Sequence, residues 1–215
     1  MKEPGQAVHP SLGVVLLAAG EGARMGGLPK SLIRIDGQPL IQRSLAAMTA
    51  AGASALVVVT GHYAELIEPL VDAPLARIVR NPAPERGQAS SVRVGLEALG
   101  GDCDAVIVAL ADQPLVGAGE IAELLDGFRR RPAGARVVYP SVGGERGNPV
   151  VLAGPLVQQL IDEGKAGAVR KFIDAHPAQV HVLDTDNRAF VTDLDTRDDV
   201  AAFEARTGCK LALPA

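Results

Sequence analysis

Short apolar runs recur along the chain at regular intervals, and this spacing limits the folds available to it more than any other feature. The runs are rich in β-branched residues and are bounded by glycines or polar residues. They span residues 13–18, 55–60, 75–80, 104–111 and 135–139. Continuous apolar runs of this length predict strands that are buried on both faces.

Apolar residues at helical spacing fill the gaps between these runs. They recur every three to four residues within 40–48, 66–71, 92–99 and 121–128. Alternating strands and helices predict an α/β fold with a mostly parallel sheet between two helical layers, a three-layer αβα, Rossmann-like architecture. Aromatic residues make up only 3% of the chain, so the core is expected to be aliphatic.

The pattern loosens after residue 139. A glycine-rich loop is expected over 141–149, and further elements follow it: helices at 155–161, 169–175 and 197–206, and a strand at 179–184. This part is expected to extend the same sheet, so residues 1–215 form a single domain, with residues 1–12 flexible.

Charge and composition exclude several classes of protein. The net charge is −4, which disfavours general binding to nucleic acid because that requires a basic surface. The two cysteines, Cys103 and Cys209, belong to no metal-binding pattern. The longest apolar runs are too short to span a bilayer, and no signal-peptide pattern is visible, so we expect a cytoplasmic protein without membrane partners.

The loop after the first run combines glycines with two cations. Gly20 and Gly22 allow the backbone to approach a ligand closely, and Arg24 and Lys30 add positive charge, which suits a polyphosphate. The loop is neither a dinucleotide fingerprint nor a Walker A loop, since Met25 replaces the third glycine of the first and a proline precedes Lys30. The alternative is a surface turn with two solvated cations.

An acidic residue follows the fourth run. Asp112 lies where the carboxyl end of a central strand is expected, and Mg²⁺ commonly binds one or two such carboxylates together with phosphate oxygens. Asp112 could instead cap the helix expected near Val116 or open a turn with Pro114.

Two further clusters leave similar alternatives. Gly87 and Ser91 could frame a flat base, although serines at a helix start are usually N-caps. Asp193 or Asp195 could be a second metal ligand, although Asp195-Thr196 is also a good capping start for the last helix.

Five motifs together resemble the MobA-like nucleotidyltransferases, and most closely the molybdenum cofactor cytidylyltransferases. They span the chain from about residue 13 to 204. They are Leu17-Ala-Ala-Gly-Glu-Gly-Ala-Arg-Met-Gly26 with Pro29-Lys30, Gly87-Gln-Ala-Ser-Ser91, Ala111-Asp-Gln-Pro114, Arg146-Gly-Asn-Pro149 and Asp193-Leu-Asp-Thr196.

This resemblance implies a role for each matching position. Arg24, Lys30 and Asp112 would be catalytic. The nucleotide would be held by Leu17, Ala18, Ala19, Gly20, Gly22, Arg24, Lys30, Asn81, Gly87, Ser91 and Asp112. The acceptor would be held by Gln113, Arg146, Gly147, Asn148 and Pro149. Mg²⁺, or Mn²⁺ in its place, would be bound by Asp112 and Asp193, with Asp195 as the alternative second ligand.

The resemblance also implies a reaction. CMP would pass from CTP to the terminal phosphate of molybdopterin, with 13–140 as the nucleotide-binding half and 141–206 as the acceptor-binding half. Related guanylyltransferases usually have glycine at the position of Ala19, which favours CTP. Asn148 stands where family members often have histidine, and asparagine cannot carry a proton.

Three alternatives remain at this point. The enzyme could use GTP, or it could act on methylerythritol phosphate or a sugar phosphate. It could also be a nucleotide-binding or chaperone-like protein that delivers the cofactor to a molybdoenzyme without turnover. A client molybdoenzyme or its chaperone could be a partner in addition to the small-molecule substrates.

Overall fold

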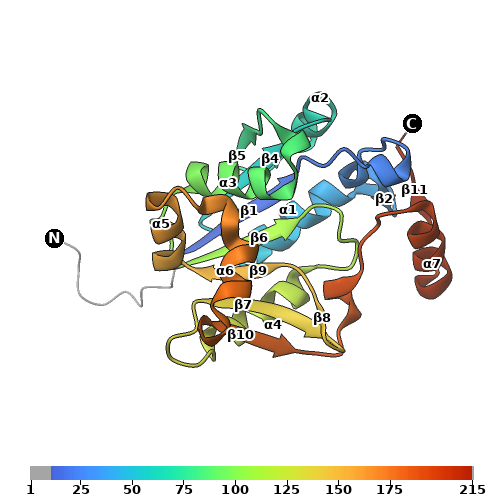
Figure 1. The fold of residues 1–215 in the computed structure, drawn as a ribbon. Helices are drawn as coiled ribbons and strands as arrows, with labels where there is room; N and C mark the ends of the chain where they lie inside the picture. The colour runs from blue at the N-terminus through green and yellow to red at the C-terminus, as the bar shows by residue number, and fades with distance from the viewer. Residues whose placement is uncertain (1–10, 215) are drawn as a thin grey trace.

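The computed structural model describes residues 11–214, which form one mixed eight-stranded sheet with helices on both faces (Figure 1). The strand order is β10-β7-β9-β6-β1-β4-β5, and β8 pairs with the edge of β7. The β6–β1, β1–β4, β4–β5 and β7–β10 pairs are parallel, whereas β9 runs antiparallel to both of its neighbours. The predicted α/β class with a mostly parallel sheet is therefore confirmed.

Each of the predicted apolar runs forms a strand of this sheet. They are β1 (Leu12–Ala18), β4 (Ala55–Thr60), β5 (Ala76–Arg80), β6 (Ala105–Leu110) and β7 (Val137–Val142), and the run at 179–184 forms β10 (Val180–Asp184). Strand β1 is central, and every one of its residues is buried. A hydrophobic core lies on each face of the sheet, and the side chains of β1 alternate between these two cores, with Leu16 in one and Leu17 in the other.

The helices divide between the two faces as the alternation predicts. α1 (Leu40–Ala50) and α4 (Ala118–Arg129) pack on one face. The other face is covered by α3 (Gln88–Leu99), α5 (Gly154–Asp162) and α6 (Val169–Ala175), which lie in front of the sheet in Figure 1. Gly95 of α3 lies so close to β1 that an added Cβ would be 2.3 Å from Cγ1 of Val15.

Two predicted elements differ from the structure at one edge of the sheet. β5 is an edge strand rather than a strand buried on both faces, and Ile78 is 37% exposed. The helix expected over 66–71 is shorter, because α2 (Ala64–Ile67) gives way to a 3-10 turn over Glu68–Leu70 that contains Pro69.

The expected loop at 141–149 also contains regular structure. The end of β7 folds back through Gly143 and Gly144 into β8 (Glu145–Arg146). The chain then enters β9 (Val150–Ala153), which lies between β6 and β7. The second part of the chain thus extends the same sheet, as the sequence predicts.

A second, three-stranded sheet lies apart from the first. It consists of β2 (Arg34–Ile35), β3 (Gln38–Pro39) and β11 (Leu211–Ala212), and it shares a small core with α7 (Arg197–Thr207). This core contains Met25, Leu194 and Phe203, so it joins the glycine loop after β1 to the segment before α7.

Residues 1–12 are expected to be flexible, and residues 1–10 of this segment lie outside the described residues. Leu12 is instead the buried first residue of β1. Within residues 11–214, no helix has the length and apolar character needed to cross a bilayer.

Candidate active site

The carboxyl ends of β1, β4 and β6 open onto a cleft of about 480 Å³. In a parallel sheet this edge is where ligands bind. The residues that line the cleft come from six separate stretches of the chain: Leu17, Ala19, Gly20, Glu21, Arg24, Lys30, His62, Pro84, Glu85, Gly87, Gln88, Ser91, Leu110, Asp112, Asn148, Asp193 and Asp195.

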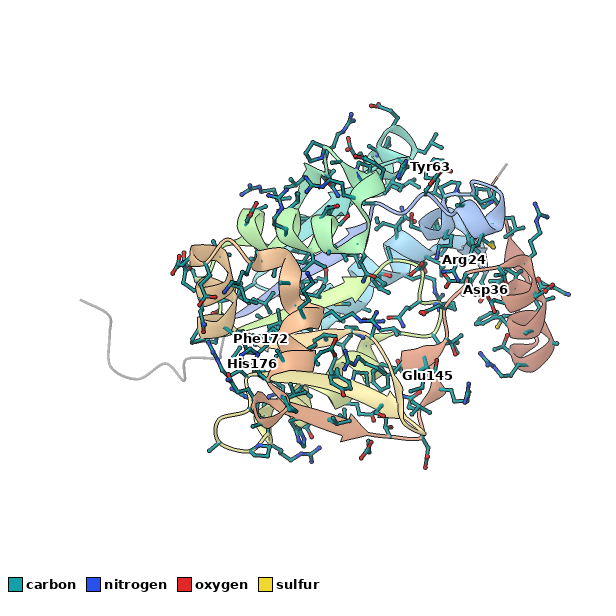
Figure 2. All side chains as sticks on the ribbon, in the orientation of Figure 1. Arg24, Asp36, Tyr63, Glu145, Phe172 and His176 are labelled. Carbon is teal, nitrogen blue, oxygen red and sulfur yellow. The ribbon has the colours of Figure 1, made fainter. Side chains whose placement is uncertain are left out.

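The loop that follows β1 is held in one shape by local contacts. Gly22 has φ 65°, and an added Cβ would lie 2.1 Å from the carbonyl oxygen of Leu28, so no side chain fits there. The hydroxyl of Tyr63 lies within hydrogen-bond distance of the carbonyl oxygens of Glu21 and Gly27. Figure 2 labels Tyr63 and Arg24 on the two sides of this loop.

Three ion pairs connect this loop to two other parts of the site. Nζ of Lys30 lies 2.5 Å from Oδ2 of Asp112 and 2.7 Å from Oδ1 of Asp195. Nη2 of Arg24 lies 2.5 Å from Oδ2 of Asp195. Burial of the ammonium lowers the pKa of Lys30, but the two carboxylates outweigh this effect and raise it above its usual value. Lys30 therefore stays protonated, and both Lys30 and Arg24 are already held by carboxylates.

Asp193 has the most strongly shifted pKa of the acids in the cleft. Burial raises the pKa of this carboxyl to about 6, and the negative charges of Asp112 and Asp195 contribute to the shift. Its Oδ1 atom is buried and has no hydrogen-bond partner among the described residues. Oε1 of Gln113 is in the same condition.

The unpartnered oxygen of Asp193 and the carboxylate of Asp112 fit a divalent cation. A buried carboxylate oxygen without a partner is costly unless a cation or a water molecule satisfies it, and Asp112 lies in the same cleft as Asp193. Within residues 11–214, no group of three or more His, Cys, Asp or Glu side chains could hold a metal by itself. Two carboxylates are nevertheless enough for Mg²⁺ when phosphate oxygens and water complete its shell.

The opposite wall of the cleft is formed at the start of α3. Nδ2 of the buried Asn81 donates hydrogen bonds to the hydroxyls of Ser90 and Ser91, at 2.8 and 2.9 Å. Gly87, not a serine, is the N-cap of α3. The N-cap interpretation of these serines is therefore wrong, and Asn81 acts from behind the cleft by holding Ser91 in its wall.

Neither Asp112 nor Asp195 caps a helix with its side chain. α4 begins at Ala118 with Gly117 as its N-cap, so Asp112 does not cap it. Thr196 and Asp199 form the capping box of α7, whereas the side chain of Asp195 is paired with Arg24 and Lys30.

The remaining residues implied by the resemblance lie around this cleft or behind it. Ala18 lines a small pocket behind the first loop, and Gln113 is buried, with its Nε2 donating to the carbonyl of Phe190. Arg146 and Gly147 line a second cavity, which shares Gln88 and Asn148 with the cleft. Gly22, Asn81 and Pro149 line neither cavity.

Three residues that the sequence motifs do not single out also line the cleft. They are His62, Glu21 and Glu85, and His62 has the clearest positional signal. Its position two residues after Thr60, the end of β4, was the available signal, because the residues after each central strand face the same edge.

Asp195 competes with any anion for the two cations of the first loop. We expect Asp195→Asn to tighten binding of inorganic triphosphate in EDTA by roughly 3- to 10-fold, since two ion pairs of modest strength are weakened. Isothermal titration calorimetry measures this. Asp198→Asn removes the same charge from an exposed position of α7 and should have no effect. Weaker binding in Asp195→Asn would show that Asp195 orients the cations rather than competing for them.

The chain is similar to several known proteins. A family model described as the MobA-like NTP transferase domain matches residues 14–180. Nicotine blue oxidoreductase of Paenarthrobacter nicotinovorans is 32% identical over 200 residues, which cover 89% of this chain and 96% of that protein. The bifunctional protein GlmU of Mycobacterium marinum is 40% identical over 120 residues. These cover 53% of this chain, which spans about a quarter (24%) of GlmU.

Solved structures show the same fold. Rv0371c of Mycobacterium tuberculosis H37Rv superposes with a TM-score of 0.73 at 22% identity, covering 90% of this chain and 96% of that one. Rv0371c has also been solved in complex with manganese.

Proposed function

This chain belongs to the MobA-like NTP transferase family, and from that premise we propose that it transfers CMP from CTP to the terminal phosphate of molybdopterin and releases pyrophosphate. The observation that carries the proposal is the meeting of Arg24, Lys30, Asp112 and Asp193 in one cleft at the carboxyl ends of the strands. These side chains supply both the positive charge and the metal ligands that a triphosphate needs.

The chain's own residues would act mainly by position and charge. The acceptor phosphate is already an anion, so its in-line attack on the α-phosphorus requires no strong general base. Lys30 is held in the wall of the cleft by two ion pairs, so it would stabilise the charge that builds up on the phosphates, and Arg24 would hold the departing pyrophosphate. Asp112 and Asp193 would hold a divalent cation, which supplies further charge neutralisation when bound, as the manganese complex of Rv0371c indicates for a protein of the same fold.

The proposed choice of CTP rests on Ala19. This residue lines the cleft, and its main chain packs against Gly61, where an added Cβ would lie 2.7 Å from the carbonyl oxygen of Ala19. The side chain of Ala19 is buried and packs beside Gly61, so the choice of CTP is supported by the family pattern, in which related guanylyltransferases usually have glycine at this position. One methyl group at such a position accounts for about 1–3 kcal/mol of selection between bases.

A panel of nucleotides and acceptors tests the proposal. Pyrophosphate release with Mg²⁺ is measured for CTP, GTP, ATP and UTP, each with molybdopterin, methylerythritol phosphate, a sugar phosphate or no acceptor. We expect release from CTP only when molybdopterin is present. Release with GTP would overturn the choice of base, and release with a sugar or methylerythritol phosphate would overturn the choice of acceptor.

The full-length similarity to nicotine blue oxidoreductase favours one second candidate, a redox enzyme that acts on an aromatic dye. A reduced nicotinamide nucleotide contains the phosphates that the cleft could hold. Bleaching of nicotine blue in its presence, insensitive to Mg²⁺ and to Asp112→Asn, would support this activity. Absence of bleaching together with CTP-dependent transfer would exclude it.

A further inference from the structure

A second cavity of about 330 Å³ opens beside the cleft. It lies between the start of α3, the strands β6 and β9, the end of β8, and α6, which crosses in front of the sheet in Figure 1. Gln88 and Asn148 line both spaces, so a molecule in the second cavity can reach the first. The cavity is thus placed to hold the body of an acceptor whose phosphate lies in the cleft.

The floor of this cavity is aliphatic. Its side chains come from α3, β6, β9 and α6, and none is more than 9% exposed: Val92, Val108, Val150, Val169 and Ile173. Such a surface offers no hydrogen bond to a hydroxyl group. Each sugar hydroxyl placed against it would lose its water without compensation, so the floor selects against a polyol and favours a ring without hydroxyls.

Two arginines, Arg146 and Arg170, line the cavity. Arg146 is fixed in place, because its guanidinium lies 4.7 Å from the ring of Tyr139 and 3.0 Å from Oδ1 of Asp174. Arg170 of α6 is exposed and forms no ion pair with any residue in 11–214. A cation without a partner at the edge of an apolar cavity is available to an anionic group of the ligand.

Two glycines give the cavity its shape. At Gly167 an added Cβ would lie 2.5 Å from the carbonyl oxygen of Ala89, and at Gly147 it would lie 2.6 Å from that of Phe190. Backbone therefore packs directly on backbone at both walls, and the cavity cannot be widened or closed by a change of rotamer there.

We propose that this cavity is the acceptor subsite and that the acceptor carries two features besides its reacting phosphate: a ring without the hydroxyl groups of a sugar, and a second anionic group held by Arg170 beside Arg146. The proposal rests on the nucleotidyl transfer proposed above. It adds Arg170 and the aliphatic floor as determinants of specificity.

Two fluorescent ligands that differ in one charge test the subsite directly. Pterin-6-carboxylate and neutral pterin are titrated into the full chain, with glucose 1-phosphate as the polyol competitor. We expect pterin-6-carboxylate to bind about 10-fold more tightly than pterin and glucose 1-phosphate not to displace it. Arg170→Ala should lower the affinity for the carboxylate to that for neutral pterin and leave neutral pterin unchanged.

Lys171→Ala is the matched control. Lys171 is the exposed neighbour of Arg170 on α6 and does not line the cavity, so its loss should change neither affinity. Equal loss of pterin-6-carboxylate binding in both variants, or no loss in Arg170→Ala, would overturn the assignment of Arg170. Tight binding of glucose 1-phosphate would overturn the proposed acceptor class.

Steady-state kinetics then separates this inference from the function on which it rests. With CTP and molybdopterin, Arg170→Ala should raise the KM for molybdopterin by about 10-fold and leave the KM for CTP and kcat within twofold. Transfer with an unchanged KM for molybdopterin would contradict the subsite while the proposed function stands. Binding of pterin-6-carboxylate through Arg170 without transfer to any acceptor would support the subsite and contradict the proposed function.

Discussion

Replacing Asp112 with asparagine is expected to lower kcat for nucleotidyl transfer by about 10³-fold. Asp112 lies in the cleft, its Oδ2 atom is 2.5 Å from Nζ of Lys30, and it is one of the two carboxylates proposed to hold the divalent cation. Asparagine keeps the size of the side chain but removes the charge that the cation requires. Initial rates of pyrophosphate release over a range of Mg²⁺ concentrations measure the effect.

Binding of CTP in EDTA provides the control for this variant. Lys30 keeps its second partner, Asp195, in Asp112→Asn, so metal-free affinity for CTP should stay within about threefold of the wild type. Asp198→Asn, which removes an exposed charge, should keep the full rate. Full Mg²⁺-dependent turnover in Asp112→Asn would show that Asp112 is not a metal ligand.

Replacing Asp193 with asparagine is expected to lower turnover by about 10²-fold and at the same time to stabilise the fold above pH 6. Burial raises the pKa of this carboxyl to about 6, from 3.8 for a free aspartate. Between pH 3.8 and 6 the folded chain therefore binds more protons than the unfolded chain, and its free energy of unfolding falls as the pH rises. The loss is complete above pH 6.

Thermal unfolding in EDTA at several pH values measures the second effect. At pH 8 the asparagine variant should be more stable by about 1–2 kcal/mol, because solvent screens part of the unfavourable burial, and Tm should rise by roughly 2–6 °C. The difference in stability between the variant and the wild type should disappear towards pH 4. It should also shrink when Mg²⁺ is added to the wild type, because bound metal stabilises the ionised carboxylate. A variant that is less stable than the wild type at pH 8 would contradict the unfavourable burial of this charge.

The layers of the fold could be predicted because the hydrophobic periodicity of the sequence indicates which segments form strands and which form helices. Val14 and Val15 face opposite cores, so the run that contains them is apolar throughout, as in any strand covered on both faces. The same pattern wrongly predicted that the strand within 75–80 is buried on both faces. An apolar run does not reveal whether helices cover both of its faces, and Ile78 lies on an edge strand.

The antiparallel strand β9 shows a different limit. Its four residues, Val150–Ala153, lead directly into α5, and a short apolar run next to a helix cannot be distinguished from the start of that helix. The small sheet of β2, β3 and β11 is equally hidden, because two-residue strands have no period to detect.

The candidate site was largely predictable because the residues after each parallel strand meet at one edge. This rule brought Gly20, Asp112 and Ser91 to one cleft. It could not give the pairing of Arg24 with Asp195, which are 171 residues apart, since that contact depends on how the small core holds the segment before α7. Nor could it give the role of Asn81, whose side chain acts from behind the wall of the cleft.

The most direct test of the proposed reaction follows the α-phosphate itself. The chain is incubated with Mg²⁺, molybdopterin and CTP labelled with ³²P at the α-position, and the products are treated with phosphatase and separated. We expect the label to move into a molybdopterin-containing product that resists phosphatase, in step with pyrophosphate release. With Asp112→Asn the label should stay in CTP, from which phosphatase releases it as inorganic phosphate. Complete release of the label by phosphatase, with molybdopterin and with every other phosphorylated acceptor tested above, would contradict nucleotidyl transfer by this chain.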